Sequence, residues 1–289
     1  LLERAAKGSR TYDGFYPSLH FTYEVRDDFL VRAAYAKTYG RPDLTNVIPN
    51  ININEFDLGE DSDASQTPGR LTIRNTGLRP WSADNYDLSL EFYTKQGGFI
   101  SGGVFFKEIA DFFATRRDIA TAERIEELGL DPEYVGWEVD TNYNIAGIAR
   151  VSGVEVNVRH SLQPFGEWGR YFQIFANGTK LRLEGPAEAN FNSFIPETAH
   201  WGVNFSKGRF SLVTRWNYRG LQRRNVDNNV QGFVYAAPRT TFDVNVEVRV
   251  LKNLSWYFNA QNVTDVDQVT MRYGPQTPDY ARRTQVSKY

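Results

Sequence analysis

Apolar and polar residues alternate along most of this 289-residue chain, and this period of two constrains the fold more than any other feature. In the clearest segment, Phe242 and four valines occupy every second position of residues 242–250, with Asp, Asn, Glu and Arg between them. Successive side chains of a β-strand point to opposite faces, so the pattern predicts strands with one apolar and one polar face. We expect about ten such strands in antiparallel hairpins, with an eleventh beginning near Tyr280.

The connections between the predicted strands alternate between short turns and long polar stretches. The short turns fall near residues 26–28, 95–98, 162–170, 206–208 and 251–253. The long stretches fall near residues 40–82, 110–143, 184–197, 220–238 and 263–279. Alternate connections of an up-and-down antiparallel sheet lie at the same end, so all long loops should emerge on one side. One helix is expected in a long loop, over residues 118–128, with Gly129 ending it.

A soluble β-sandwich would show the same alternation, so the period alone leaves open what the apolar face contacts. The predicted strands have about nine to eleven residues, which suits a tilted crossing of a bilayer, whereas sandwich strands usually have about five or six. Aromatic residues make up 15% of the chain and gather towards strand ends, as in the aromatic girdles of membrane proteins. These features favour an antiparallel transmembrane β-barrel.

The alternation also assigns each strand residue to a face. We expect these side chains to face lipid: Leu19, Phe21, Tyr23, Val25, Leu88, Leu90, Val154, Val156, Val158, Val244, Val246, Val248, Trp256 and Phe258. We expect these to face a water-filled lumen: Glu24, Arg32, Asp87, Glu91, Glu155, Arg159, Arg215, Asp243, Glu247 and Arg249. Charges of both signs suit a hydrated wall and not a dry core. An open sheet cannot span a bilayer, so about ten strands imply a larger barrel of which this chain is a part.

Composition argues against several other classes of protein. The chain has no Cys, which excludes cysteine catalysis and disulfide scaffolds, and its net charge of −2 gives no field for nucleic acid. The three His residues lie on different predicted strands without metal-ligand spacing, and the acidic run at residues 55–63 lacks a calcium-loop pattern. Arg219, Arg223 and Arg224 form a small basic cluster in a long loop, where solvation or an anionic ligand would suit them. We therefore expect no enzyme, no catalytic residue, no metal and no cofactor.

Several segments resemble TonB-dependent outer-membrane receptors. One is the hairpin that enters at residues 17–19 and continues through residues 30–42. Another has Asn75, Leu78 and Pro80 in an Asn-x-x-Leu-x-Pro pattern before the strand at residues 85–93. Similar segments occur at residues 105–112, 152–155 and 261–265. The five matches follow the family's order over nearly the whole chain.

The resemblance implies an outer-membrane receptor that imports a nutrient ligand with energy delivered through TonB. The family's barrel has about 22 strands, of which residues 1–289 would supply roughly the second half as part of one domain, without the plug domain and the closing strand. The implied partners are outer-membrane lipid, the plug domain, TonB through an N-terminal region outside this chain, and a small ligand such as a siderophore, cobalamin, saccharide or peptide. The long loops would capture that ligand. A passive porin, a barrel adhesin and a soluble β-sandwich binding module remain alternatives.

Overall fold

The computed structural model of the chain describes residues 11–56, 68–95, 97–186, 191, 193–227, 232–274 and 276–287. The acidic residues 57–63 of the first long connection lie outside the described residues. Most of the described chain forms antiparallel strands, which confirms the predicted all-β fold. Among the described residues there is no helix with the length and apolar character needed to cross a lipid bilayer.

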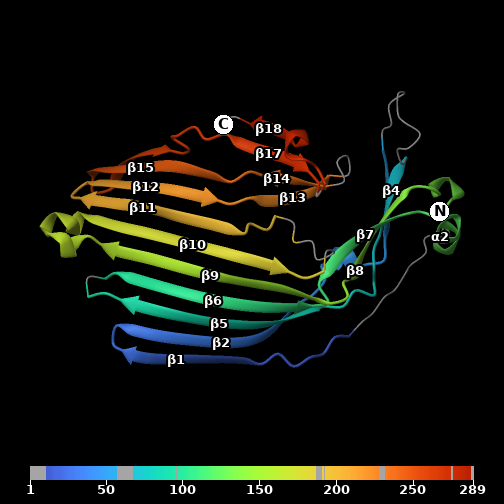
Figure 1. Ribbon diagram of the computed structural model, residues 1–289, viewed down its shortest axis with the longest axis horizontal. Coiled ribbons are helices and arrows are strands. Elements are labelled where there is room, and N and C mark those ends of the chain that lie inside the picture. Colours follow the sequence, from blue (N-terminus) through green and yellow to red (C-terminus); the bar gives the residue numbers. More distant parts are fainter. Residues whose placement is uncertain are drawn as a thin grey trace.

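A ten-stranded antiparallel sheet forms a curved wall (Figure 1). Its strands, in order across the sheet, are β1 (Ser18–Arg26), β2 (Phe29–Gly40), β5 (Trp81–Tyr93), β6 (Phe99–Ala110), β9 (Ile148–Ser161), β10 (Phe172–Glu184), β11 (Glu197–Lys207), β12 (Phe210–Arg219), β15 (Arg239–Leu251) and β16 (Leu254–Ala260). This order also follows the chain, as expected for an up-and-down sheet. Several strands are longer than the alternation predicted, because β9 has 14 residues and β5, β10 and β15 have 13 each.

The short connections gather at one end of the wall and the long ones at the other (Figure 1). This arrangement confirms the prediction from the alternating loop lengths. The connection between β9 and β10 is the most elaborate at the short end, because it contains the 3-10 helices Gln163–Phe165 and Glu167–Tyr171. The two ends of the wall are therefore different in construction, and the long end carries most of the additional structure.

The chain forms two further four-stranded sheets, and seven of their eight strands lie in connections that were predicted to be polar loops. The eighth, Arg283–Ser287, corresponds to the eleventh strand predicted near Tyr280, but it begins after a 3-10 turn at Asp279–Ala281 and pairs within a small sheet instead of joining the wall. One consists of β3 (Ile51–Glu55), β4 (Gly69–Ile73), β8 (Glu138–Asn144) and β7 (Phe113–Ile119). The other consists of β13 (Gln222–Asp227), β14 (Gly232–Ala236), β17 (Gln268–Tyr273) and β18 (Arg283–Ser287). Strand β4 pairs with β8 in parallel, which joins the connection after β2 to the connection after β6. Two long loops thus form one folded unit, here called the two-loop sheet.

The two-loop sheet has a small apolar core of its own, closed by helix α2 (Ala122–Leu128). Leu71 of β4 has no exposed surface, and Ile125 of α2 is 2% exposed. The helix begins later than predicted, because residues 113–119 extend as β7 and the Thr121 side chain caps the first turn. Its end at Gly129 is confirmed, since this residue adopts a left-handed φ of 64°.

The long strands are interrupted where the wall meets the smaller sheets. Asp111, between β6 and β7, has a φ of 57°, and Gly147, between β8 and β9, has a φ of 106°. Pro238 separates β14 from β15, and it has no N–H to donate to a sheet. Between β16 and β17, Asn262 and Asp265 each have a positive φ of 50°. Positive φ is incompatible with a continuous strand, so Asp111, Gly147, Asn262 and Asp265 end strands of the wall.

The segment with the Asn-x-x-Leu-x-Pro pattern fastens the two-loop sheet to the wall. The Asn75 side chain donates to the backbone carbonyl of Asn142 at 2.9 Å, and Leu78 is 1% exposed. The backbone N–H of Arg79 donates to Oδ1 of Asn144 at 2.9 Å, and its carbonyl accepts from Nδ2 of Asn144 at 2.8 Å. These contacts explain the Asn-x-x-Leu-x-Pro pattern, because the Asn75 amide and the buried Leu78 hold the turn before β5 against β8.

Candidate functional site

The register of the wall gathers the predicted lipid-facing residues on one face. Directly paired residues share a face, and the rows are continuous, as in Val104–Val154 or Val156–Gly178. Val25 lies beside the bulge between Glu24 and Arg26 and so falls outside the paired rows. We call this face the apolar band. It comprises thirteen of the fourteen predicted residues, all except Val25, together with Val31, Ile100, Val203, Leu212, Trp201, Trp216 and Phe242.

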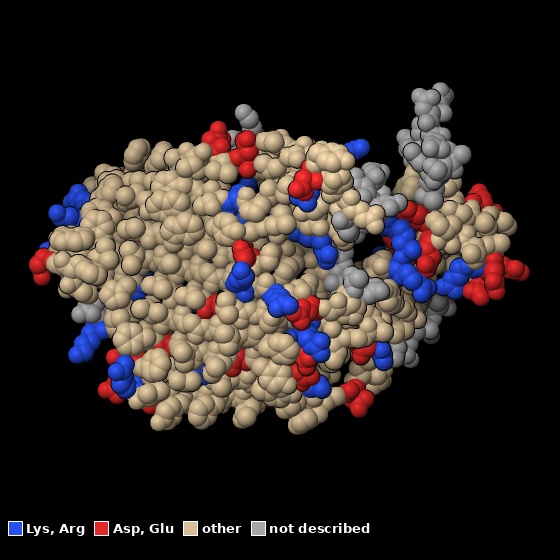
Figure 2. Space-filling view, in the orientation of Figure 1, with Lys and Arg blue, Asp and Glu red and all other residues tan. Residues whose placement is uncertain are grey.

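The apolar band is exposed on the wall. Leu19 is 70% exposed, Trp256 is 66% exposed and Val156 is 50% exposed. Figure 2 shows a largely uncharged surface over the part of the long strands near the short connections, with charged side chains mostly towards the other end. An exposed apolar face of this extent needs a partner, and a bilayer is one. The assignment of the band to lipid remains a prediction.

Charged residues of both signs border the apolar band at the end with the long connections. They lie on the same face as the band and form paired rows, for example Lys37–Asp84, Glu108–Arg150 and Lys180–Glu197. Ion pairs join Arg150 to Glu108 at 2.8 Å and Lys180 to Glu197 at 2.8 Å. We call this set the charged belt, which consists of Lys37, Asp84, Glu108, Arg150, Lys180, Arg182, Glu184 and Glu197.

The predicted lumen-facing residues all lie on the opposite face of the wall. The register pairs two of them directly, Arg215 with Asp243, and an ion pair at 2.9 Å joins two others, Arg32 and Glu91. The remaining six have other neighbours on that face: Glu24 lies opposite Leu30, Asp87 between Ala34 and Phe105, Glu155 between Gly103 and Thr179, Arg159 between Phe99 and Phe175, Glu247 between Ser211 and Tyr257, and Arg249 opposite Ser255. Their contact with a lumen remains a prediction.

Hydrogen bonds on this polar face link neighbouring strands. Arg32 of β2 donates to Thr22 of β1 at 3.1 Å and to Glu91 of β5 at 2.9 Å. The Tyr93 hydroxyl donates to the second oxygen of the same carboxylate at 2.9 Å. These side chains thus satisfy one another's hydrogen-bonding groups, mostly between neighbouring strands. Such bonds suit a hydrated surface whose side chains hold fixed positions.

A second network on the polar face centres on Asp243 of β15. Asn217 of β12 donates to Oδ2 of Asp243 at 2.7 Å, and the backbone N–H of Asn262 donates to Oδ1 at 2.9 Å. Because the Asn217 amide nitrogen points at the carboxylate, its Oδ1 faces Nδ1 of His200 at 2.9 Å. The His200 ring therefore carries its proton on Nδ1. The network ties β11, β12 and β15 to the chain after β16.

Asp243→Ala is expected to lower the stability of the folded protein by about 3 kcal/mol. The substitution removes a charged acceptor from two hydrogen bonds, each of which contributes roughly 1.5–3 kcal/mol. Urea unfolding of the full-length protein in detergent micelles, followed by tryptophan fluorescence, measures the change. Asp243→Asn is the control, since it keeps one acceptor oxygen and should lose less. Equal midpoints for Asp243→Ala and the unsubstituted protein would show that the network contributes nothing.

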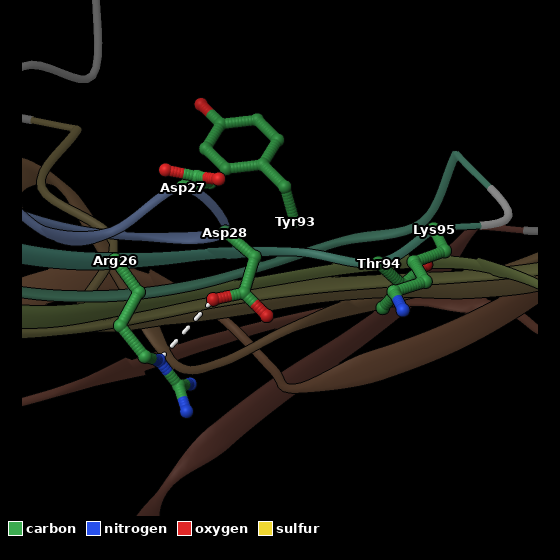
Figure 3. A pocket seen from close by; sticks show the side chains of 6 residues that line it. All are labelled: Arg26, Asp27, Asp28, Tyr93, Thr94 and Lys95. Atoms are coloured by element: carbon green, nitrogen blue, oxygen red, sulfur yellow. Dashed lines mark ion pairs between the residues drawn. The ribbon is translucent and has the colours of Figure 1, made fainter.

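An open pocket of about 580 Å³ lies between two short connections, β1–β2 and β5–β6 (Figure 3). Its lining has both signs of charge: Arg26, Asp27, Asp28, Tyr93, Thr94 and Lys95. The ion pair of Arg26 with Asp28 at 3.3 Å is largely exposed. With two acids and two bases at the rim, the pocket has no charge preference for a ligand.

The sheet of β13, β14, β17 and β18 holds a cluster of aromatic rings and arginines at the long end. Tyr235 and Tyr273 stack with their ring centroids 4.3 Å apart. The Arg282 guanidinium lies over the Tyr273 ring at 4.4 Å, and that of Arg223 lies over the Phe233 ring at 4.6 Å. We call these five residues the arginine–aromatic cluster. They present cations and flat rings together, which suits an anionic ligand with planar groups.

Burial and the neighbouring Tyr273 raise the pKa of Tyr235 above its usual range, and the positive charges of Arg223 and Arg282 oppose that rise. Tyr235 is therefore a neutral hydrogen-bonding group near pH 7. In the sequence, Arg223 groups with Arg219 and Arg224 because the three are close in the chain. The structure instead adds Arg282, since β14, β17 and β18 are neighbours in one sheet. That pairing between distant segments has no short-range signal in the sequence.

The fold and the face pattern agree with comparisons against known proteins. Residues 3–263 match the family model "TonB dependent receptor-like, beta-barrel". The chain therefore belongs to the TonB-dependent receptor β-barrel family, as the resemblance of its segments predicted. A soluble β-sandwich, which the alternation alone had left open, does not account for this match. No curated protein is significantly similar to the chain in sequence.

Solved receptors share the fold at low sequence identity. A mutant of the ferric enterobactin receptor PfeA from Pseudomonas aeruginosa, in complex with enterobactin, aligns with 16% identity and a TM-score of 0.64 over 87% of this chain and 35% of its own. The siderophore receptor PirA from Pseudomonas aeruginosa aligns with 17% identity and a TM-score of 0.62 over 87% and 39%. The copper transporter OprC aligns with 15% identity and a TM-score of 0.58 over 87% of this chain and 34% of its own. The chain thus spans somewhat more than a third of these receptors.

Proposed function

We propose that this chain forms part of the barrel of a bacterial outer-membrane receptor that imports a nutrient ligand with energy coupled through TonB. The family match over residues 3–263 is the observation that carries the proposal. The exposed apolar band supports a place in the membrane, since its residues lie on nine of the ten strands of the wall. In this proposal the polar face lines the interior and contacts the plug domain.

The smaller sheets at the long end would form the capture surface for the ligand. Loops that carry function are commonly held by a rigid scaffold, and here the scaffold is the ten-stranded wall. The solved structures are of PfeA, a ferric enterobactin receptor, of PirA, a siderophore receptor, and of OprC, a copper transporter. Iron chelates are therefore the first ligands to test, followed by copper, cobalamin, saccharides and peptides.

Uptake measurements on a deletion strain test the proposed function. A strain without the complete gene should lose uptake of one labelled nutrient, and the complete gene should restore it. Removal of TonB from the complemented strain should abolish the same uptake, because the transport would be active. Uptake that persists without TonB would instead indicate a passive porin, and unchanged uptake of every nutrient would favour an adhesin.

The arginine–aromatic cluster is proposed as a contact for an anionic ligand with planar groups. The double variant Arg223→Ala/Arg282→Ala should weaken binding of such a ligand about tenfold or more, because each desolvated cation–π or charge contact contributes about 1–2 kcal/mol. Binding of ferric catecholate chelates to cells, in the cold and without energy, measures affinity separately from transport.

The matched control for that variant is Arg170→Ala. The Arg170 guanidinium also lies over a tyrosine ring, Tyr171, at 4.9 Å, but at the end of the wall with the short connections. Its loss should leave ligand affinity unchanged. If both variants bind the ligand as the unsubstituted receptor does, the cluster is not a ligand contact. Loss of uptake with unchanged binding would assign the arginines to a later step.

A further inference from the structure

Two arginines lie side by side on one face of the sheet formed by β13, β14, β17 and β18. Arg272 of β17 and Arg283 of β18 are directly paired in the register, so their side chains share a face. Both residues are exposed. Like charges directly opposite each other on a sheet destabilise it. An anion bound between the two guanidinium groups would remove this repulsion.

The arginine pair lines a small open pocket of about 180 Å³ together with Thr270, Thr284 and Gln285. Thr270 and Gln285 pair directly in the next row of the sheet, so they share the face of the arginines. No carboxylate of the described residues lines this pocket, in contrast to the pocket at the short connections. Pockets for drug-sized ligands have about 300–1,000 Å³, so this one suits a single small group.

The strand residues next to the pocket on this face are also uncharged. Val234 of β14 is the direct neighbour of Arg272, and Ala236 is that of Thr270. Asp279, in the turn before β18, pairs with Arg282 at 2.7 Å. In the described part of the chain, no ion pair joins Arg283 to a carboxylate. Arginine keeps its proton at neutral pH, so the lining brings two positive charges and no negative one.

This pocket is separate from the arginine–aromatic cluster. Successive residues of a strand face opposite sides, so Tyr273 and its partner Phe233 lie on the other face of the sheet. The guanidinium groups of Arg223 and Arg282 lie over those two rings. One face of the sheet therefore combines cations with aromatic rings, and the other combines cations with a hydroxyl and an amide.

We propose that this pocket binds a phosphate group, either free or as the monoester of a larger solute. A guanidinium donates two parallel hydrogen bonds to phosphate oxygens, and two guanidinium groups match a charge of about −1.5 to −2 at pH 7. The Thr270 hydroxyl and the Gln285 amide add donors for the remaining oxygens. A carboxylate ligand, with one charge and two oxygens, would use only part of this set. Binding to the pocket requires neither transport nor TonB, so it is independent of the proposed function.

Equilibrium dialysis of the full-length protein in detergent against radiolabelled inorganic phosphate tests the proposal. The unsubstituted protein should bind phosphate saturably. Arg272→Ala/Arg283→Ala should bind it at least about tenfold more weakly, because charge-assisted hydrogen bonds are roughly twice as strong as neutral ones. The double variant should still fold, since it removes a pair of like charges from an exposed face. Equal affinity in the double variant and the unsubstituted protein would overturn the proposal, as would the absence of saturable binding.

Arg116→Ala/Arg124→Ala is the matched control, because it removes the same two charges from the long end. Each of these arginines is exposed but pairs with a carboxylate, Arg116 with Asp118 at 2.7 Å and Arg124 with Glu127 at 2.9 Å. Phosphate affinity should therefore stay unchanged in the control. An equal loss in both double variants would show that phosphate responds only to net charge, which would rule out the pocket.

Hydrogen–deuterium exchange locates the bound phosphate. Amides of β17 and β18 should exchange more slowly with phosphate present, while those of β7 and β8 should not change. Unchanged exchange in β17 and β18 at saturating phosphate would place the anion elsewhere and contradict the proposal.

Competition with glycerol 3-phosphate distinguishes the two sources of the phosphate group. Displacement of labelled phosphate at a similar concentration assigns the pocket to a phosphate monoester. Retention of the label assigns it to free phosphate.

Discussion

Val156→Arg is expected to prevent the barrel from entering the outer membrane, while Asn157→Arg should be tolerated. Val156 belongs to the apolar band and is 50% exposed, between Gly102 and Gly178 in its row. An arginine on a lipid face near the bilayer midplane costs about 2–4 kcal/mol. The long strand continues on both sides, so the side chain would have several residues to cross before reaching water.

Asn157 is the matched control for Val156, because it is the next residue in the chain and its side chain lies on the opposite face of the wall. It lies between Ser101 and Asn177 in a polar row, and its amide is 3.5 Å from the Ser101 hydroxyl. A charge there would lie among polar groups and should cost little. The two variants introduce the same residue at adjacent positions of one strand, so the β-propensity of arginine cannot explain a difference in outcome.

Membrane fractionation and heat-dependent gel mobility measure the result. The Val156→Arg protein should be degraded or remain unfolded, and the Asn157→Arg protein should be recovered folded at normal amounts. The same experiment tests the whole assignment of faces to lipid and lumen. If both variants insert equally, or if only Asn157→Arg fails, the assignment is wrong.

Leu71→Ala is expected to open the two-loop sheet while leaving the wall intact. Leu71 has no exposed surface and packs in the core with Ile125 of α2 and Trp137. A leucine truncated in such a core costs about 2–5 kcal/mol. The core has few members, so this loss is a large part of the local stability of the two-loop sheet.

Hydrogen–deuterium exchange resolves the effect by segment. Amides of β4 and β8 should exchange at least about tenfold faster in Leu71→Ala, while those of β5 and β9 should not change. Ile53→Ala is the control, since Ile53 lies opposite Leu71 in the register but is 45% exposed. Faster exchange in β5 and β9 as well would show that the two-loop sheet and the wall unfold together.

Because β4 pairs with β8 from a different long connection, Leu71→Ala should affect both connections. Arg70 of β4 pairs with Glu138 of β8 at 2.7 Å, and Arg117 of β7 pairs with Asp140 at 2.7 Å. These ion pairs cross from one long connection to the other or lie next to that crossing. Loss of the core should therefore loosen both loops at once, although they are far apart in the chain.

The sequence predicts the wall well because each wall strand carries its own signal. Phe242 to Val250 alternate without interruption, and their pairing partners follow directly after a short turn. The charged belt was missed for the opposite reason. Asn177, Gly178 and Thr179 interrupt the apolar pattern of β10, so the alternation assigned no face to Lys180 and the residues after it. In the structure the strand continues to Glu184, because its backbone keeps pairing with β9 after the apolar surface ends.

The small sheets were missed because their stability is not local. Strands β3 and β4 have five residues each, and β4 depends on β8 from another loop for its second neighbour. Helix α2 was found because its apolar spacing and the glycine stop are local, and only its start was wrong. The arginine–aromatic cluster likewise needs β17 and β18 beside β14, which no pattern within one strand indicates.

The interruptions at Asp111, Gly147, Pro238 and Asn262 also determine how force can pass through the molecule. In a continuous hydrogen-bonded sheet, a force applied to one end of a strand is transmitted along the whole strand. Here the strands of the wall end at these residues, and the strands of the smaller sheets begin beyond them. We therefore expect a pull on the smaller sheets to be taken up by rotation about these residues, while the strands of the wall keep their register.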